Sequence, residues 1–212
     1  MESTEPLKID IVSDVICPWC LIGARRLELA LEKRPDLKVD VEYHAFLLDP
    51  STPPEGADLR DRLRKKYGDP EPLFRRVETV ARGDGIPLDF SRVTRTPSTV
   101  PAHTLIRHAR AKGTQFGLVK ALFGAYFLDG RDVSDVAVLQ GVAQPFGFDA
   151  DEVAALVSSE TELQTTRKEA RLNAERGITG VPFTVLGQRV AVPGAQEVSV
   201  FERAIAQVLG SD

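Results

Sequence analysis

The sequence has little cysteine or tryptophan, no excess of basic residues and no long apolar run. Its 212 residues include 2 Cys and 1 Trp, so a disulfide scaffold is excluded. The 27 Lys and Arg against 31 Asp and Glu give a net charge of -4, which argues against a nucleic-acid-binding surface. No stretch of about 18 apolar residues is present, which excludes a spanning helix. We therefore expect neither a nucleic acid nor a membrane as partner.

The first eight residues also lack the marks of an export signal. MESTEPLK has neither a basic start nor an apolar block, so we expect a cytoplasmic protein. The length suffices for one large domain, or for a small domain that carries a big insertion, with a core that needs no disulfides.

The opening of the chain has the pattern of strand, helix and strand. Residues 7–13 alternate apolar with polar residues, 18–34 have a helical apolar stripe, and 38–47 alternate again. Two strands joined by a helix within one sheet are parallel, with a right-handed crossover. The first strand leads directly into the two cysteines.

The middle of the chain is helical in pattern. Helices are predicted over 57–67, 71–84, 101–113, 115–128, 134–146, 150–159 and 161–176. Further on, 183–186 and 189–192 flank Gly187-Gln188, which predicts a tight hairpin, and 198–209 predicts a closing amphipathic helix. We therefore expect an α/β fold built from residues 1–52 and 161–212, interrupted by an all-helical insertion over 53–160.

The two cysteines form one C-x-x-C pair, Cys17 and Cys20. Pro18 suits the first position of a helix, so the helix dipole and its free amides favour negative charge on Cys17. The spacing of three residues places both sulfurs on one turn, where Cys20 can resolve a mixed disulfide formed at Cys17. The pair predicts a redox site with Cys17 as nucleophile and Cys20 as resolving thiol. Trp19, between them, either shields the pair, contacts a partner or simply packs.

Two other interpretations of the pair remain open. The cysteines could be inert buried thiols, or they could bind zinc together with His103 and His108. The zinc site has poor geometry, because more than 80 residues separate its halves and five helical positions turn His108 about 140° from His103. We expect no metal. His44, in the second predicted strand, is expected to be a packed or edge residue.

A second motif, Gly180-Val181-Pro182-Phe183, precedes the predicted hairpin. A C-x-x-C after the first strand, followed by a later X-Pro before a hairpin, resembles the thioredoxin superfamily. The resemblance implies a cis Val181–Pro182 bond facing the cysteines. It also implies that Val181 and Pro182 form an edge where the backbone of a substrate docks by β-augmentation.

The resemblance extends along nearly the whole chain and is to the FrnE-like branch of the DsbA family. It rests on the segments Ser13–Cys20 with Gly23, Phe46–Pro50, Pro101–His103, Gly180–Phe183 and Gly194–Gln196. It implies a thioredoxin-like fold with a helical domain inserted in it. Thr104 departs from the arginine expected after Ala102-His103, which puts a substrate contact at that position in doubt.

These features predict a thiol:disulfide oxidoreductase that reduces or isomerises disulfides of proteins or small thiols. Trp19, Val181 and His103 are the expected substrate contacts, no cofactor is expected, and glutathione is a candidate reductant. Even a dithiol–disulfide couple with a reduction potential near about -120 mV would favour its reduced form by about 6 kcal/mol in a cytosol whose potential is near about -250 mV.

The first alternative is a glutathione-dependent isomerase or transferase of the 2-hydroxychromene-2-carboxylate isomerase type. Such relatives usually carry serine where this chain has Cys17. The second alternative is a non-catalytic binding module or a zinc-holding chaperone.

Overall fold

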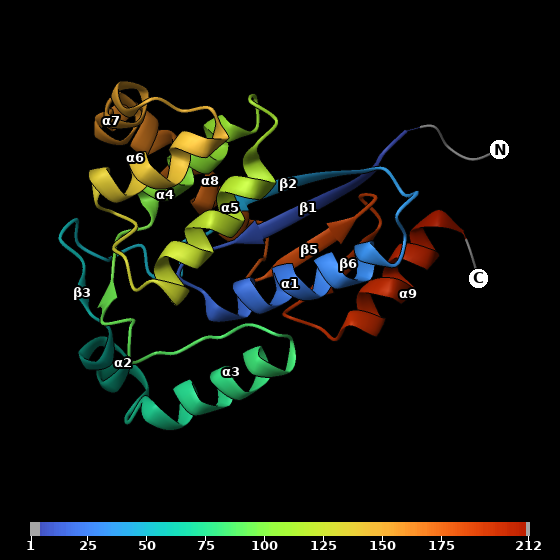
Figure 1. Ribbon diagram of the computed structural model, residues 1–212, viewed down its shortest axis with the longest axis horizontal. Helices are drawn as coiled ribbons and strands as arrows, with labels where there is room; N and C mark the ends of the chain where they lie inside the picture. Colours follow the sequence, from blue (N-terminus) through green and yellow to red (C-terminus); the bar gives the residue numbers. More distant parts are fainter. Residues whose placement is uncertain (1–4, 211–212) are drawn as a thin grey trace.

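A four-stranded mixed sheet lies at the centre of the computed structural model, which describes residues 5–210 (Figure 1). Its strands β1 (Leu7–Ser13), β2 (Val39–Ala45), β5 (Phe183–Leu186) and β6 (Val190–Pro193) stand in the order β2-β1-β5-β6. Strands β1 and β2 are parallel, whereas β5 is antiparallel to both β1 and β6. The predicted strand-helix-strand unit and the predicted hairpin are therefore confirmed.

Helices α1 (Pro18–Glu32) and α9 (Val198–Leu209) contact each other on one face of this sheet (Figure 1). Their apolar stripes supply Ile22, Leu27, Phe201 and Ile205 to the core, where Ile9 of β1 is fully buried. Burial of these side chains removes large apolar areas from water and stabilises this layer. Among the described residues, no helix is both long and apolar enough to cross a bilayer.

Most of the regular structure between β2 and α8 (Glu160–Glu175) is helical, as predicted. It contains α2 (Leu59–Tyr67), α3 (Glu71–Gly83), α4 (Val100–Ala109), α5 (Gln115–Phe123), α6 (Val136–Ala143) and α7 (Ala150–Ser158). A π-helical turn at Gly124–Leu128 extends α5, and a 3-10 turn at Gln144–Phe146 extends α6.

One feature of this region differs from the all-helical expectation. The short strands β3 (Ala57–Asp58) and β4 (Arg95–Thr96) form an antiparallel pair. The start of the helix expected at residue 57 is therefore strand, and α2 begins at Leu59. Two-residue strands are too short for an alternating pattern to show in the sequence.

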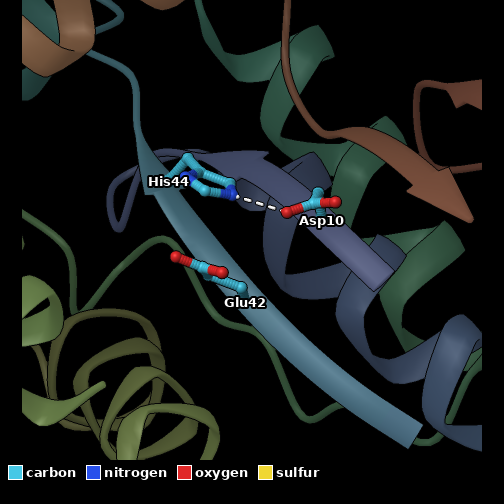
Figure 2. A group of neighbouring side chains, drawn as sticks. All are labelled: Asp10, Glu42 and His44. Atoms are coloured by element: carbon cyan, nitrogen blue, oxygen red, sulfur yellow. Dashed lines mark hydrogen bonds and ion pairs between the residues drawn. The ribbon is translucent and has the colours of Figure 1, made fainter. Parts of the chain in front are cut away.

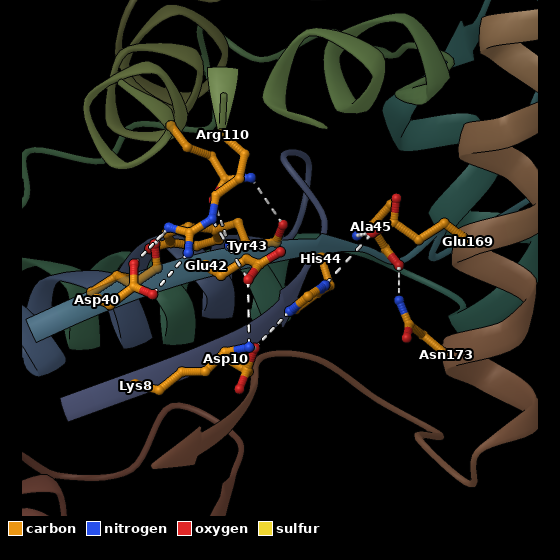
Figure 3. Close-up of polar contacts among 12 residues, drawn as sticks. Lys8, Asp10, Asp40, Glu42, Tyr43, His44, Ala45, Arg110, Glu169 and Asn173 are labelled. Atoms are coloured by element: carbon orange, nitrogen blue, oxygen red, sulfur yellow. Dashed lines mark hydrogen bonds and ion pairs between the residues drawn. The ribbon is translucent and has the colours of Figure 1, made fainter. Parts of the chain in front are cut away.

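The outer edge of β2 is closed by side chains from α5 and α8. Gln115 accepts a hydrogen bond from the Tyr43 N–H (2.8 Å) and donates one to the Tyr43 carbonyl (3.2 Å). Glu169 accepts from the Ala45 N–H (3.1 Å), and Asn173 donates to the Ala45 carbonyl (2.9 Å; Figure 3). These contacts satisfy backbone groups that an edge strand leaves free. They also attach α5 and α8 to the sheet that carries the cysteines.

Candidate active site

The two cysteines lie where β1 leads into α1. Cys17 is the residue that precedes the first turn of α1, Pro18 follows at the first helical position, and Cys20 lies one turn further on. The Cys17 N–H donates to the Asp14 carbonyl at 3.0 Å, which fixes the connection between strand and helix. Both thiols are free, and the two cysteines are 3.4 Å apart. The spacing therefore places them in direct contact at a helix N-terminus.

The two thiols have different surroundings. Burial raises the pKa of Cys20 well above its usual value, and hydrogen bonding and charge at Cys17 raise it further, against opposing hydrogen bonds from Ser13 and the Asp14 backbone. Cys17 stands at the positive end of the α1 dipole, and the first turn of that helix holds no acidic residue. Burial therefore keeps Cys20 protonated, while Cys17 lies at the N-terminus of α1.

The loop before β5 covers the cysteines from the other side. The Val181–Pro182 peptide bond is cis, the conformation that the sequence predicts. The Cys17 thiol lies 3.6 Å from the Val181 carbonyl oxygen, within hydrogen-bond range for sulfur. Pro182 is buried and packs closely against α1 at Gly23. A Cβ added at Gly23 would lie only 2.9 Å from the Pro182 Cγ. The lack of a side chain at Gly23 lets this loop approach the helix.

A buried polar pair, Asp14 and His103, lies behind the cysteines. His103 is 3% exposed, and its Nε2 lies 3.3 Å from the Asp14 Oδ1. The other carboxylate oxygen of Asp14 accepts from the Leu48 N–H at 2.8 Å. His103 therefore contacts the turn that holds Cys17, and the substrate contact expected for it stays a prediction. Asp14 was not among the candidate residues, since nothing in its sequence neighbours marks this carboxylate as buried.

A cavity of about 1050 Å³ opens beside Cys17. Trp19 and Val181, two of the expected substrate contacts, line it together with Cys17, whereas His103 is not among its lining residues. Its opposite wall is formed by α2 and α3. Cys17, the predicted nucleophile, thus lies beside a space large enough for a small-molecule or peptide ligand.

The cysteines and histidines of the zinc interpretation do not form a metal-binding group. Across residues 5–210, the only group of three or more potential ligands is Asp10, Glu42 and His44, on β1 and β2 (Figure 2). His108, from the zinc interpretation, instead contacts Glu162 at 2.9 Å.

The group of Asp10, Glu42 and His44 is an ion-pair network. The Lys8 ammonium lies 3.5 Å from Asp10 and 3.6 Å from Glu42, and His44 Nε2 lies 2.9 Å from Asp10 (Figure 3). The carboxylates are therefore balanced by cations of the protein itself. His44 belongs to this network on the sheet and is not among the residues that line the cavity.

Comparisons with known proteins agree with this arrangement. The family model described as a DSBA-like thioredoxin domain matches residues 8–206. The uncharacterized protein YwbO of Bacillus subtilis (strain 168) is 27% identical over 202 residues, which cover 93% of this chain and 95% of that protein.

Several solved structures share the fold. A probable DsbA oxidoreductase from Streptomyces coelicolor is 30% identical, with a TM-score of 0.85 over 97% of this chain and 91% of that one. A cytosolic disulfide reductase, DsbM from Pseudomonas aeruginosa with glutathione, is 20% identical, with a TM-score of 0.63 and 96% of each chain covered. A 2-hydroxychromene-2-carboxylate isomerase is 18% identical, with a TM-score of 0.73 and 95% of each chain covered.

Proposed function

The chain belongs to the DSBA-like thioredoxin domain family, and we propose that it is a thiol:disulfide oxidoreductase that works through Cys17 and Cys20. One observation carries the proposal: two free thiols in contact at a helix N-terminus, the first of which opens onto a cavity. A thiolate that is both stabilised and reachable is what disulfide exchange requires.

The reaction proceeds in two exchanges. The Cys17 thiolate attacks one sulfur of a substrate disulfide, forms a mixed disulfide with it, and the other substrate sulfur leaves as a thiolate that takes up a proton. Cys20 then loses its proton and attacks the Cys17 sulfur, which releases the second substrate thiol and leaves a Cys17–Cys20 disulfide. Two electrons pass to the substrate, and a thiol reductant such as glutathione returns the enzyme to its dithiol form.

Trp19, Val181 and Pro182 complete the proposed site. Trp19 and Val181 line the cavity beside the nucleophile, so a substrate bound there contacts both. The Val181 backbone is proposed to pair with an extended substrate chain. Pro182 has no N–H and therefore places no donor of its own against the sulfur.

We place the reaction in the cytosol, in the direction of substrate reduction or isomerisation. Support comes from the similar fold of a P. aeruginosa enzyme named as a cytosolic disulfide reductase. In such a compartment the dithiol rests reduced, because even a strongly oxidising couple near about -120 mV is held reduced by a cytosol near about -250 mV.

Insulin reduction in the presence of dithiothreitol tests the proposal. The intact protein should accelerate the reaction. Cys17→Ser should abolish the acceleration, and Cys20→Ser should accumulate a mixed disulfide visible by mass spectrometry without reductant. Because the chain has 2 Cys, the double serine variant is a thiol-free control. Equal inactivity of the single variants, with no adduct in either, would contradict the roles assigned to the two thiols.

A glutathione-dependent isomerase is the second candidate. The observation that favours it is the cavity beside Cys17, whose lining includes Trp19, Phe74 and Phe90 and so suits a small aromatic compound. Turnover of 2-hydroxychromene-2-carboxylate with glutathione, retained in Cys20→Ser, would support this candidate, and its absence would remove it.

A further inference from the structure

The wall of the cavity that faces Cys17 combines apolar and basic side chains. Tyr67 at the end of α2 is 59% exposed and Leu73 at the start of α3 is 42% exposed, although both line the cavity. Phe74 and Val77 lie buried beneath them. Large apolar groups left open to water at the rim of a cavity are typical of a binding surface.

Three of the four basic residues on this wall have no acidic partner. Lys65 and Lys66 of α2 and Arg76 of α3 line the cavity and are exposed. In the described part of the chain, none of the three forms an ion pair, although neighbouring basic residues such as Arg62 and Arg64 do. Lys66 lies 5.1 Å from the centre of the Tyr67 ring, so apolar and cationic surfaces are adjacent.

The acidic residues on the same wall are already engaged. Asp49 pairs with Arg62, and Asp61 lies 2.8 Å from Arg64. The Asp58 side chain accepts from the Asp61 N–H at 2.8 Å and caps α2. The wall therefore presents three unpaired positive charges, against one carboxylate, Asp58, that has no basic partner in the described part of the chain, although the chain as a whole is acidic.

The size of the cavity indicates how much of a substrate it accepts. At about 1050 Å³ its volume is just above the range of about 300–1,000 Å³ for pockets that hold drug-sized ligands. Its lining runs from Cys17 and Val181 to Lys66 and Arg76. A peptide substrate whose disulfide lies at the Cys17 sulfur can therefore also reach the basic wall with its neighbouring residues.

We propose that the preferred substrate is a cysteine disulfide within an acidic peptide segment that also carries an apolar side chain. Glutamate or aspartate residues beside the cysteine meet Lys65, Lys66 and Arg76, and the apolar residue packs on Tyr67 and Leu73. The inference rests on the proposed disulfide exchange at Cys17. Unpaired charges of one sign raise the association rate of an oppositely charged partner, and salt screens the effect.

Three synthetic peptides test this preference. Each carries one cysteine as a mixed disulfide with 2-mercaptoethanol and one phenylalanine, and its remaining residues are Glu, Gln or Lys. Single-turnover rates are divided by the rate of the same enzyme with bis(2-hydroxyethyl) disulfide, which is small and neutral. At low salt we expect the Glu peptide to react at least about ten-fold faster than the Lys peptide. The ratio should fall toward one at high salt.

Charge-reversal variants locate the effect. Lys65→Glu with Lys66→Glu, or Arg76→Glu alone, should lower the ratio of Glu to Lys peptide rates. Arg75→Glu is the matched control, because Arg75 adjoins Arg76 on α3, is also exposed and does not line the cavity. It should keep most of the preference for the Glu peptide.

Distinct outcomes overturn the two proposals. Equal rates for all peptides, or an equal effect of Arg75→Glu and Arg76→Glu, would overturn the acidic-substrate inference. The inference would also be overturned if the Lys65→Glu and Lys66→Glu substitutions lowered the rate with glutathione disulfide but not the rate with the Glu peptide. No reaction with bis(2-hydroxyethyl) disulfide would instead overturn the disulfide exchange itself.

Discussion

The two walls of the cavity differ in almost every physical respect. The wall that carries Cys17 is mostly apolar and is held by β1, α1 and the Pro182 loop, with Cys17 only 3% exposed and Trp19 and Val181 half-buried. The wall made by α2 and α3 is exposed and charged, and α2 buries only Leu59. The proposed disulfide exchange therefore takes place on the wall that carries Cys17, where small displacements alter reactivity. The exposed side chains of the other wall can change at little cost in stability.

An ion pair that is largely shielded from water links the two walls. Arg26 of α1 donates to Asp84, at the end of α3, at 2.7 Å and to the Ala195 carbonyl at 2.9 Å. Both charged side chains are largely shielded from water. The pair holds α3 against the helix that carries the cysteines.

Arg26→Ala should therefore have the largest effect on stability. It leaves the Asp84 carboxylate buried without its partner, and we expect the free energy of unfolding to fall by about 3–5 kcal/mol. Arg25→Ala is the control on the same helix, since Arg25 forms partly exposed pairs with Glu28 and Glu32 and should cost about 1 kcal/mol or less. Urea unfolding measures both, and similar losses would contradict a special role for the buried pair.

One substitution made on each wall should give opposite results. Gly23→Ala on α1 forces a methyl group against the Pro182 ring, 2.9 Å away, and against Ala195. We expect it to cost about 1–3 kcal/mol through overpacking and to slow disulfide exchange. Gly83→Ala, at the end of α3, meets nothing within 4 Å and should be neutral or stabilising by up to about 1 kcal/mol.

Thermal unfolding and insulin reduction distinguish the two glycines. A Gly23→Ala variant as active and stable as the parent would show that the Pro182 loop tolerates displacement. Slowed exchange in Gly83→Ala would show that the outer wall takes part in the chemistry.

The sequence predicts the wall that carries Cys17 better than the outer one. Cys17, Cys20 and Pro182 occur in short motifs that fix local geometry, and the alternation of β1 and β2 specifies their pairing. The positions of Asp14 and His103 could not be predicted, because 89 residues separate them and only tertiary packing brings them together. The basic wall could not be predicted either, since Lys65 and Lys66 lie on α2 and Arg76 lies on α3, and the relative placement of these helices has no local signal.

The smallest effect is expected outside both walls, at His44 on β2. Burial alone would lower the pKa of His44, but contacts with Glu169 and Asp10 outweigh it and raise the pKa. A raised folded-state pKa means that the ion pairs stabilise the protein fully below the ordinary value of about 6.5 and are lost as the pH rises through the higher folded value. Stability measured by urea unfolding should therefore fall slightly between about pH 6 and pH 8, by about 1 kcal/mol or less.

His44→Gln, which cannot be protonated in this range, should flatten that part of the profile. The rate with bis(2-hydroxyethyl) disulfide, relative to the parent at each pH, should not change in this variant, because His44 contributes to neither wall of the cavity. A His44→Gln profile that matches the parent would assign the pH dependence to another group, and an altered exchange rate would connect this network to the thiols.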